Sequence, residues 1–290
     1  MDEKETSPWF NAVEWAVFEY TEMPDPVSTG FTNIDRLHLG GLVPGLHMLM
    51  GEPGAGKSAI SIQMAVRCSM QGCGAAIVSL EMMPQETWLR AASLWSCYDR
   101  EMSFNWSDAR NAARSLRGMT IDERRDIDSV LHASRGMATL PLYISHPESP
   151  DIDSITGLME DASKMGVRLV VIDYLQLVRA PGEREHERVG AAVNALAGAA
   201  IQNSQAVVCI SAMNRDSLKG PASMHSGAGS SLIEYAAQSV SLIYRDHEDP
   251  SVANGGTYVY MKVFKNRNGM VTDEPLTFVY YPKCNLFQEQ

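Results

Sequence analysis

A glycine-rich stretch is the part of this sequence best suited to chemistry. It consists of Gly51, Glu52, Pro53, Gly54, Ala55, Gly56, Lys57 and Ser58. Small residues at this spacing let successive backbone N–H groups curl around phosphate oxygens at a helix amino terminus. The lysine of such a loop reaches the β- and γ-phosphates, and the hydroxyl that follows it binds Mg²⁺. The stretch therefore predicts a phosphate-binding loop for ATP and Mg²⁺, with Lys57 and Ser58 as the contacting side chains.

Two acidic residues follow apolar runs where a nucleotide site would need them. Asp173 ends the run 169–172, and Glu81 comes directly after the run 75–80. A magnesium ion bound to phosphates needs a carboxylate at the end of a neighbouring strand, and hydrolysis needs a group that orients the attacking water. We assign these tasks to Asp173 and Glu81. The alternatives are a carboxylate in a surface turn for Asp173 and a glutamate that stabilises the start of a helix for Glu81.

The elements that must position these residues alternate between short apolar runs and helical stretches, which is typical of an α/β fold with a mostly parallel sheet. We expect strands at 46–50, 75–80, 140–145, 169–172 and 206–211, and a helix at 57–70. Thr120 and Glu123 form a capping-box pattern, so another helix should begin there. Three later runs separated by turn residues, 241–244, 258–261 and 276–280, predict a carboxyl-terminal β meander.

The amino-terminal 26 residues form a separate segment by composition. Trp9, Val13, Val17 and Tyr20 recur at helical spacing, and the turn-forming stretch 23–26 ends the pattern. Two interpretations stay open: a helix packed on its own domain, or an arm that docks on a neighbouring subunit. Residues 27–290 form the second unit.

Composition narrows the class of protein. The chain has 290 residues, 45% of them hydrophobic and 20% charged, as in an ordinary globular protein. It has no apolar run of membrane-spanning length and no signal peptide pattern, so we expect a cytoplasmic protein without membrane contact. Its five cysteines show no close pairing and are expected to be reduced packing residues. The net charge of -11 requires that any DNA site be local.

Seven short blocks occur along the chain in an order that resembles the ATPase domain of DnaB-type replicative helicases. They are STGFTNID (28–35), SLEM (79–82), VIDYLQL (171–177), MNR (213–215), IEY (233–235), YRD (244–246) and KNRNG (265–269). The resemblance implies a RecA-like core that assembles into a six-membered ring, with ATP bound between subunits. The segment before residue 27 then resembles the family's linker helix, which docks on an adjacent protomer.

The resemblance also implies roles for individual residues. Lys57, Ser58, Glu81 and Asp173 match the family's phosphate lysine, magnesium hydroxyl, catalytic glutamate and magnesium aspartate. Arg90 matches an arginine close to the nucleotide. Lys265 and Arg267 match the lysine and arginine finger that a neighbouring subunit inserts. By spacing alone, these two cations would be only a charged hairpin turn.

The sequence departs from the family where DNA and the γ-phosphate would be sensed. Ala212 stands where the family has a glutamine, and the loop 227–234 lacks the usual basic residue. The candidates for DNA contact are the side chains of Arg184, Arg188, Arg215 and Lys219 and the backbone of Gly229 and Ser230. Acidic residues beside the first two arginines make a solvated surface an equal alternative.

The function implied is a ring-forming, ATP-dependent DNA helicase that translocates on single-stranded DNA during replication. The alternative is a RecA-like nucleotide switch or assembly protein that kept the ring and lost the helicase activity. A pseudoenzyme that binds ATP only structurally is a third option, against which Glu81 and Arg267 argue. Because only 26 residues precede the core, contacts that the family makes through its amino-terminal domain are not expected to carry over.

Overall fold

The computed structural model describes residues 24–99, 103–112, 120–212, 233, 235–246, 252 and 255–290. The expected amino-terminal helix around Trp9 to Tyr20 lies outside them. So do four of the DNA-contact candidates: Arg215, Lys219, Gly229 and Ser230.

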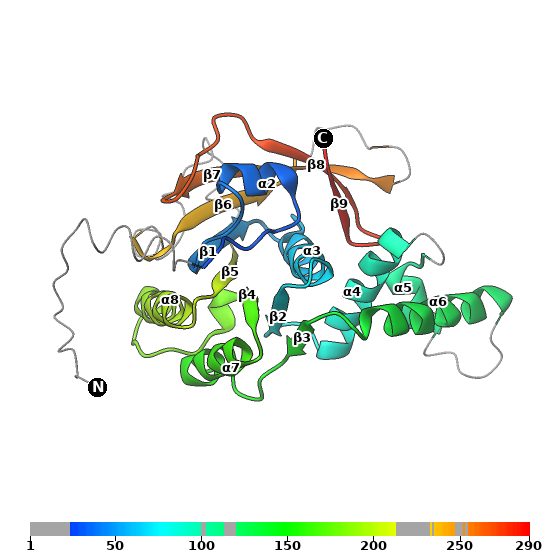
Figure 1. Ribbon diagram of the computed structural model, residues 1–290, viewed down its shortest axis with the longest axis horizontal. Helices are drawn as coiled ribbons and strands as arrows, with labels where there is room; N and C mark the ends of the chain where they lie inside the picture. Colours follow the sequence, from blue (N-terminus) through cyan, green and yellow to red (C-terminus); the bar gives the residue numbers. More distant parts are fainter. Residues whose placement is uncertain are drawn as a thin grey trace, which may run out of the picture.

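One nine-stranded sheet organises the domain, in the order β3-β2-β4-β5-β1-β6-β7-β8-β9 (Figure 1). The strands are β1 (Gly45–Gly51), β2 (Gly74–Ser79), β3 (Leu142–Ser145), β4 (Val167–Asp173), β5 (Ala206–Ala212), β6 (Ser239–Tyr244), β7 (Thr257–Asn266), β8 (Leu276–Tyr281) and β9 (Leu286–Glu289). The strands β1 to β6 pair in parallel, and β6 to β9 form an antiparallel meander. The predicted α/β class, the parallel sheet and the meander are confirmed.

Helices cover both faces of the parallel strands. They are α2 (Thr32–Leu37), α3 (Lys57–Met70), α4 (Pro84–Asp99), α5 (Trp106–Ala112), α6 (Ile121–Met137), α7 (Ile152–Lys164) and α8 (Glu185–Gln202), with a 3-10 turn at Leu175–Leu177. In Figure 1, α7 and α8 lie on one side of the strands and α3, α4 and α6 on the other.

Alternate residues of the central strands enter two separate cores. Leu169 and Val171 of β4 pack in the core on the α3 side, whereas Val170 and Ile172 pack in the core on the α8 side. Side chains of a strand alternate between the two faces of a sheet, so an apolar run without polar interruptions is what a doubly covered strand requires. This explains why the runs of Val and Ile predicted the buried strands.

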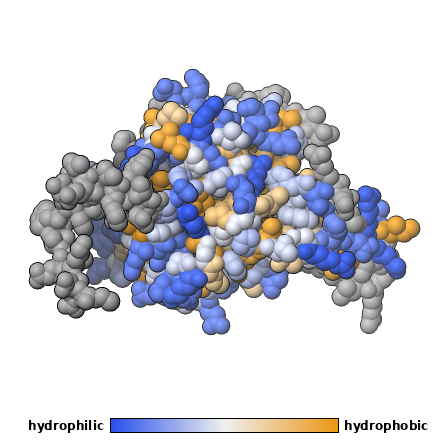
Figure 2. Space-filling model, viewed as in Figure 1, coloured by the Kyte–Doolittle hydropathy of each residue, from blue (hydrophilic) through white to orange (hydrophobic). Residues whose placement is uncertain are grey.

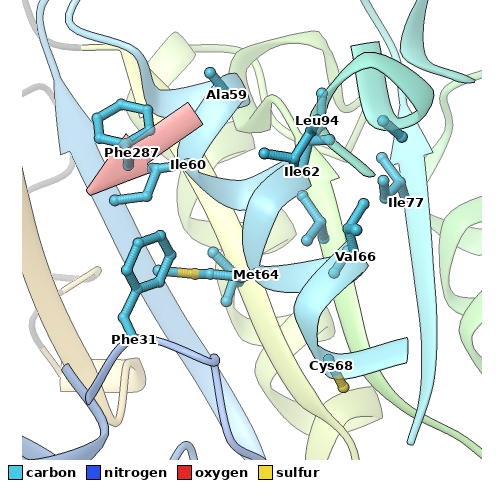
Figure 3. Close-up of a cluster of buried hydrophobic side chains, with 14 of the residues drawn as sticks. Phe31, Ala59, Ile60, Ile62, Met64, Val66, Cys68, Ile77, Leu94 and Phe287 are labelled. Atoms are coloured by element: carbon cyan, nitrogen blue, oxygen red, sulfur yellow. The ribbon is translucent and has the colours of Figure 1, made fainter. Parts of the chain in front are cut away.

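The carboxyl-terminal strand β9 holds together parts of the chain that lie far from it in sequence. Phe287 donates its backbone N–H to Gln63 Oε1 at 2.7 Å and accepts at its carbonyl oxygen from Gln63 Nε2 at 2.9 Å. Its ring packs beside Ile60 of α3 in the core drawn in Figure 3. Glu289 accepts from the backbone N–H groups of Thr32 and Asn33 and so caps α2. Thus β9 fixes both α2 and α3.

The predicted capping box is present at the start of α6. Thr120 Oγ1 accepts from the N–H of Glu123 at 3.2 Å, and the Glu123 carboxylate accepts from the N–H of Thr120 at 2.7 Å. These reciprocal bonds satisfy two backbone donors that the helix itself leaves unpaired. The prediction from residue types is therefore confirmed.

One face of the molecule, among the described residues, is largely polar (Figure 2). On the face drawn in Figure 2, hydrophilic residues predominate and apolar ones occur in small groups. Among the described residues, no helix combines the length and the apolar character that crossing a membrane requires.

Candidate functional site

The glycine loop connects the end of β1 to the start of α3, as its pattern predicts. Gly54 and Gly56 have positive φ angles of 82° and 100°. A Cβ atom on Gly56 would lie 2.8 Å from Cζ of Phe287, whereas one on Gly54 would meet nothing within 4 Å. Gly56 is therefore required for two reasons, its backbone conformation and the close approach of β9.

The ammonium group of Lys57 folds back over the loop. Its Nζ donates to the carbonyl oxygens of Gly51 and Glu52, at 2.8 Å each. Burial lowers the pKa of Lys57, and the negative charges of Asp173, Glu52 and Glu81 oppose that change. A half-buried cation held by two carbonyl oxygens is well placed to exchange them for phosphate oxygens.

Asp173 lies at the end of β4, beside the loop. Its side chain is buried, with 4% of the residue surface exposed. Burial raises the pKa of the Asp173 carboxyl, a hydrogen bond from Ser58 lowers it, and the charge of Glu81 raises it further. Ser58 and Asp173 thus lie near each other in the wall of one cavity, as two ligands of one hard cation would.

The residues predicted to bind the nucleotide of their own subunit through their side chains line one cavity of about 730 Å³. The lining includes Lys57, Ser58, Glu81, Arg90 and Asp173. No group of three or more His, Cys, Asp or Glu side chains in the described parts of the chain is placed to hold a metal ion by itself. A magnesium ion here would need further oxygen ligands from the phosphates or water, and Ser58 with Asp173 offers the oxygen donors that Mg²⁺ prefers.

Arg90 is held over this cavity by its neighbours. It pairs with Glu86 one helical turn earlier, at 2.8 Å, and its guanidinium lies 4.2 Å from the ring centre of Trp106. Trp106 in turn donates its indole N–H to the carbonyl oxygen of Pro282. The Nε atoms of Arg90 and Arg245, both in the cavity wall, are buried without a hydrogen-bond partner in the described structure. Such unpaired donors fit a cavity built for an anionic ligand.

Several lining residues were not singled out from the sequence. They include Glu86, Tyr280 and Pro282, together with Trp106 behind Arg90. The i,i+4 spacing of Glu86 and Arg90 was a usable signal. The other three come from the meander or from a separate short helix, and no local pattern marks them.

Position 212 at the end of β5 is held by Gln176. The Gln176 amide donates to Ser211 Oγ at 2.9 Å and to the Ala212 carbonyl at 3.3 Å, and its oxygen accepts from the Ala212 N–H at 3.2 Å. Ala212 lines the cavity. An amide side chain from the turn after β4 is thus fixed next to the position where the resembling family carries its glutamine.

Lys265 and Arg267 lie away from the cavity of their own chain. In the sheet, Gly51 pairs with Ile243, whereas Lys265 pairs with Val240 near the start of β6. These pairings put the two cations toward the end of the sheet opposite the glycine loop. Lys265 Nζ donates to the carbonyl of Ala237 at 2.7 Å, and Arg267 donates to that of Tyr235.

The two described candidates for DNA contact lie at the amino-terminal end of α8. Arg184 precedes the helix and Arg188 is in its first turn; both are exposed. Arg188 donates to the carbonyl of Glu183 at 3.2 Å and lines a second cavity, of about 360 Å³, with Gln176 and Arg179. The shared cavity puts Arg188 near Gln176, which contacts the end of β5.

Four of the five cysteines lie close together in two pairs after folding. All five are free thiols. Cys97 of α4 lies close to Cys284 of the β8–β9 turn, and the Cys68 thiol donates to the Cys73 carbonyl oxygen at 3.7 Å. The neighbouring Cys97 thiol lowers the pKa of Cys284 to about 7. That all five are reduced packing residues stays a prediction.

A model of the DnaB-like helicase C-terminal domain matches residues 26–289. The chain belongs to this family. Two curated bacterial relatives are similar to this DnaB-type domain. The replicative DNA helicase DnaB of Geobacillus stearothermophilus is 25% identical over 262 residues, covering 87% of this chain and 54% of the relative. The replicative DNA helicase DnaC of Bacillus subtilis (strain 168) is 24% identical over 261 residues, with the same coverage. The chain thus spans about half the length of these relatives.

Solved structures support the same fold for the DnaB-type domain. The ATPase domain of G40P superposes with a TM-score of 0.79 at 20% identity, covering 97% of this chain and 98% of that one. A DnaB-like replicative helicase, described with its interactions with primase, gives a TM-score of 0.78 at 19% identity and covers 96% and 68%. The predicted RecA-like core of a DnaB-type ATPase domain is therefore confirmed.

Proposed function

We propose that this chain is the motor domain of a DnaB-like DNA helicase, which hydrolyses ATP and moves along single-stranded DNA in replication. One observation carries the proposal. Lys57, Ser58, Glu81 and Asp173 meet in one cavity, while Lys265 and Arg267 lie toward the far end of the same sheet. The first group is sufficient to bind a nucleotide, and the second can complete such a site only on another chain.

Each residue in the cavity has a task that its position supports. Lys57 and the loop amides hold the phosphates of ATP, and Ser58 and Asp173 hold Mg²⁺. The magnesium ion neutralises charge on the phosphates when it is bound. Glu81, exposed at the cavity wall after β2, orients the attacking water. Arg90, already turned toward the cavity, binds the nucleotide.

The proposed ring is inferred from the positions of Lys265 and Arg267. Lys265 and Arg267 stabilise the charge on the γ-phosphate of ATP bound to the next subunit, which requires a closed arrangement in which every subunit both gives and receives them. A six-membered ring is the form that the family resemblance favours. Single-stranded DNA passes through its centre, with Arg184, Arg188, Arg215, Lys219, Gly229 and Ser230 as the contacts to test.

Light scattering after gel filtration, combined with ATPase assays with and without single-stranded DNA, tests the proposal. We expect an oligomer of about six chains in the presence of Mg²⁺-ATP and an ATPase rate that rises with DNA. A strict monomer whose rate ignores DNA would contradict it.

Mixed rings test the shared site. Lys57→Ala chains keep both Lys265 and Arg267, and Arg267→Ala chains keep the intact glycine loop. Mixing the two variants should restore part of the activity that each lacks, because one kind of interface in a mixed ring contains both intact halves. No recovery at any ratio would exclude the arrangement in trans.

A second function is a RecA-like nucleotide switch or assembly protein that has lost helicase activity. Ala212 in the cavity wall and the net charge of -11 favour it. Measuring DNA affinity against salt separates the two functions, because a protein that contacts several phosphates loses affinity steeply as salt rises. A steep slope supports the motor, and binding that is weak at every salt concentration supports the switch.

A further inference from the structure

The end of β7 presents alternate residues to opposite faces of the sheet. Lys265 and Arg267 bond to carbonyl oxygens of the segment that leads into β6, at Ala237 and Tyr235. Asn266, between them, contacts α2 on the other face. Successive strand residues point to opposite faces, so whatever fixes Asn266 also fixes the direction of its two neighbours.

The amide of Asn266 lies at the centre of a compact set of bonds. Its Nδ2 is within hydrogen-bond distance of the Leu37 carbonyl at 3.1 Å, His38 Nδ1 at 3.2 Å and the Met270 carbonyl at 3.3 Å. Its Oδ1 accepts from the N–H of Asn268 at 3.2 Å. An amide nitrogen has two hydrogens for these three acceptors, and no aliphatic side chain could replace it.

The anchor on the other side is the end of α2. Leu37 is the last residue of that helix, and its carbonyl is one of the oxygens that a helix leaves unpaired at its end. It accepts from Asn266 Nδ2 and also from the Met270 N–H at 2.8 Å. The β7–β8 turn is therefore bonded to one carbonyl oxygen at two points.

The helix that serves as this anchor is itself held firmly. Glu289 caps its first turn, and Asp35 accepts hydrogen bonds from Ser28 and from the N–H and hydroxyl groups of Thr29. Ile34 is buried in the core on the α3 side. A short helix fixed at both its polar and apolar faces makes a stable reference point for the turn.

The β7–β8 turn packs tightly against the end of α2, so its backbone has no room for a different path. A Cβ atom on Gly269 would lie 2.1 Å from the Leu37 carbonyl oxygen and 2.6 Å from Asn266 Nδ2. His38, which receives a bond from Asn266, is itself buried and stacks edge-on against His47. The turn thus approaches α2 as closely as backbone can, and the Asn266 amide fills the contact.

We propose that Asn266 is a positioning residue, which aims Lys265 and Arg267 at the nucleotide of a neighbouring subunit by bonding the end of β7 to the end of α2. The inference rests on the proposed function, in which the two cations act in trans. Asn266 touches neither nucleotide nor DNA in this arrangement. It holds the backbone from which both cations project.

Asn266→Ala is the variant that tests this role. We expect kcat for ATP to fall roughly 10²-fold, the order of loss that a displacement of about 1 Å causes. The KM for ATP and the affinity for nucleotide should stay unchanged, because the glycine loop is intact. Asn268→Ala is the matched control: it removes an amide from the same turn, whose bond goes to Gln238 Oε1 at 3.1 Å, and should retain most of its kcat.

Mixed rings distinguish positioning from general damage. Asn266→Ala chains have an intact nucleotide loop, so Lys57→Ala chains should supply them with correctly aimed cations and restore activity. Asn266→Ala mixed with Arg267→Ala should not recover, because neither chain provides those cations.

Four results would overturn the inference or its basis. Full kcat in Asn266→Ala, or recovery with Arg267→Ala, would show that Asn266 does not aim the cations. Failure of Asn266→Ala to recover with Lys57→Ala, while Arg267→Ala does recover, would show that Asn266 acts within its own subunit. If Arg267→Ala also fails with Lys57→Ala, the shared site of the proposed function is wrong instead.

Discussion

The nucleotide cavity and the 265–267 segment hold their charged side chains with different partners. In the cavity, opposite charges face each other: Lys57 lies close to Asp173 and Glu81, and burial shifts the pKa values of the first two. In the 265–267 segment, the bonds of the cations described above go to neutral carbonyl oxygens. The cavity thus combines both signs of charge within one chain, whereas the 265–267 segment presents two cations fixed to the backbone of the segment that leads into β6.

The largest expected effect comes from removing one cation of the 265–267 segment. In Arg267→Ala we expect kcat to fall roughly 10³- to 10⁵-fold, as for loss of an arginine finger in related chemistry. Nucleotide affinity should hardly change, because Arg267 is outside the cavity of its own chain. Steady-state ATPase assays beside binding of a fluorescent nucleotide measure both quantities. Equal losses of kcat and affinity would place Arg267 in its own subunit's site.

Next in size is the loss of the water-orienting carboxylate. Glu81→Gln keeps the shape of the side chain and should lower kcat about 10²- to 10⁴-fold while ATP binding is retained. Glu160→Gln, an exposed carboxylate on α7 paired with Lys164, is the control and should behave as the unmodified protein. Unchanged turnover in Glu81→Gln would assign the task to another group.

Two glycines of the loop test how much β9 supports the nucleotide cavity. Gly56→Ala should destabilise the protein by about 1–3 kcal/mol, because of its left-handed backbone and the contact with Phe287. Gly54→Ala has the same backbone restriction without the contact, so its loss should be smaller. Thermal unfolding of the nucleotide-free proteins compares them. Equal losses would mean that β9 does not press on the loop.

The smallest effect is on the stability of the nucleotide-free protein. Asp173→Asn should stabilise the nucleotide-free protein by about 0.5–2 kcal/mol, because it removes a buried charge beside Glu81. Burial raises the pKa of Asp173 in the folded state, so the folded protein binds the proton more tightly than the unfolded chain. Stability must then fall as pH rises through the range between the ordinary and the raised pKa.

The gain from Asp173→Asn should therefore be present at neutral pH and disappear below the ordinary carboxyl pKa. Denaturant unfolding at several pH values measures it. A variant less stable than the parent at neutral pH would show that the bond from Ser58 outweighs the cost of burial.

The sequence predicts the parallel half of the fold well, for physical reasons. Buried strands need uninterrupted Val and Ile, as in 169–172, and the glycine loop fixes where β1 ends and α3 begins. The capping box at Thr120 specifies a helix start by local bonds alone. In each case the signal lies within a few neighbouring residues.

Features built from distant residues escaped prediction. The strand β9 is only four residues long, too short for a clear alternation, and its role depends on Gln63 and Glu289 meeting partners far away in sequence. The contact between Cys97 and Cys284 likewise exists only after folding. For Lys265 and Arg267, spacing alone indicated a hairpin turn, and only the family resemblance assigned them a task that remains to be tested.

The last described strand also affects the order in which the domain can mature. Gly56 lies against Phe287, and Gln63 needs the backbone of β9 for its bonds. On a ribosome, which delivers the amino-terminal part first, the glycine loop and α3 emerge long before β9. The partly synthesised domain therefore lacks β9, the strand that packs against its glycine loop. The loop gains this support only once synthesis has passed residue 289.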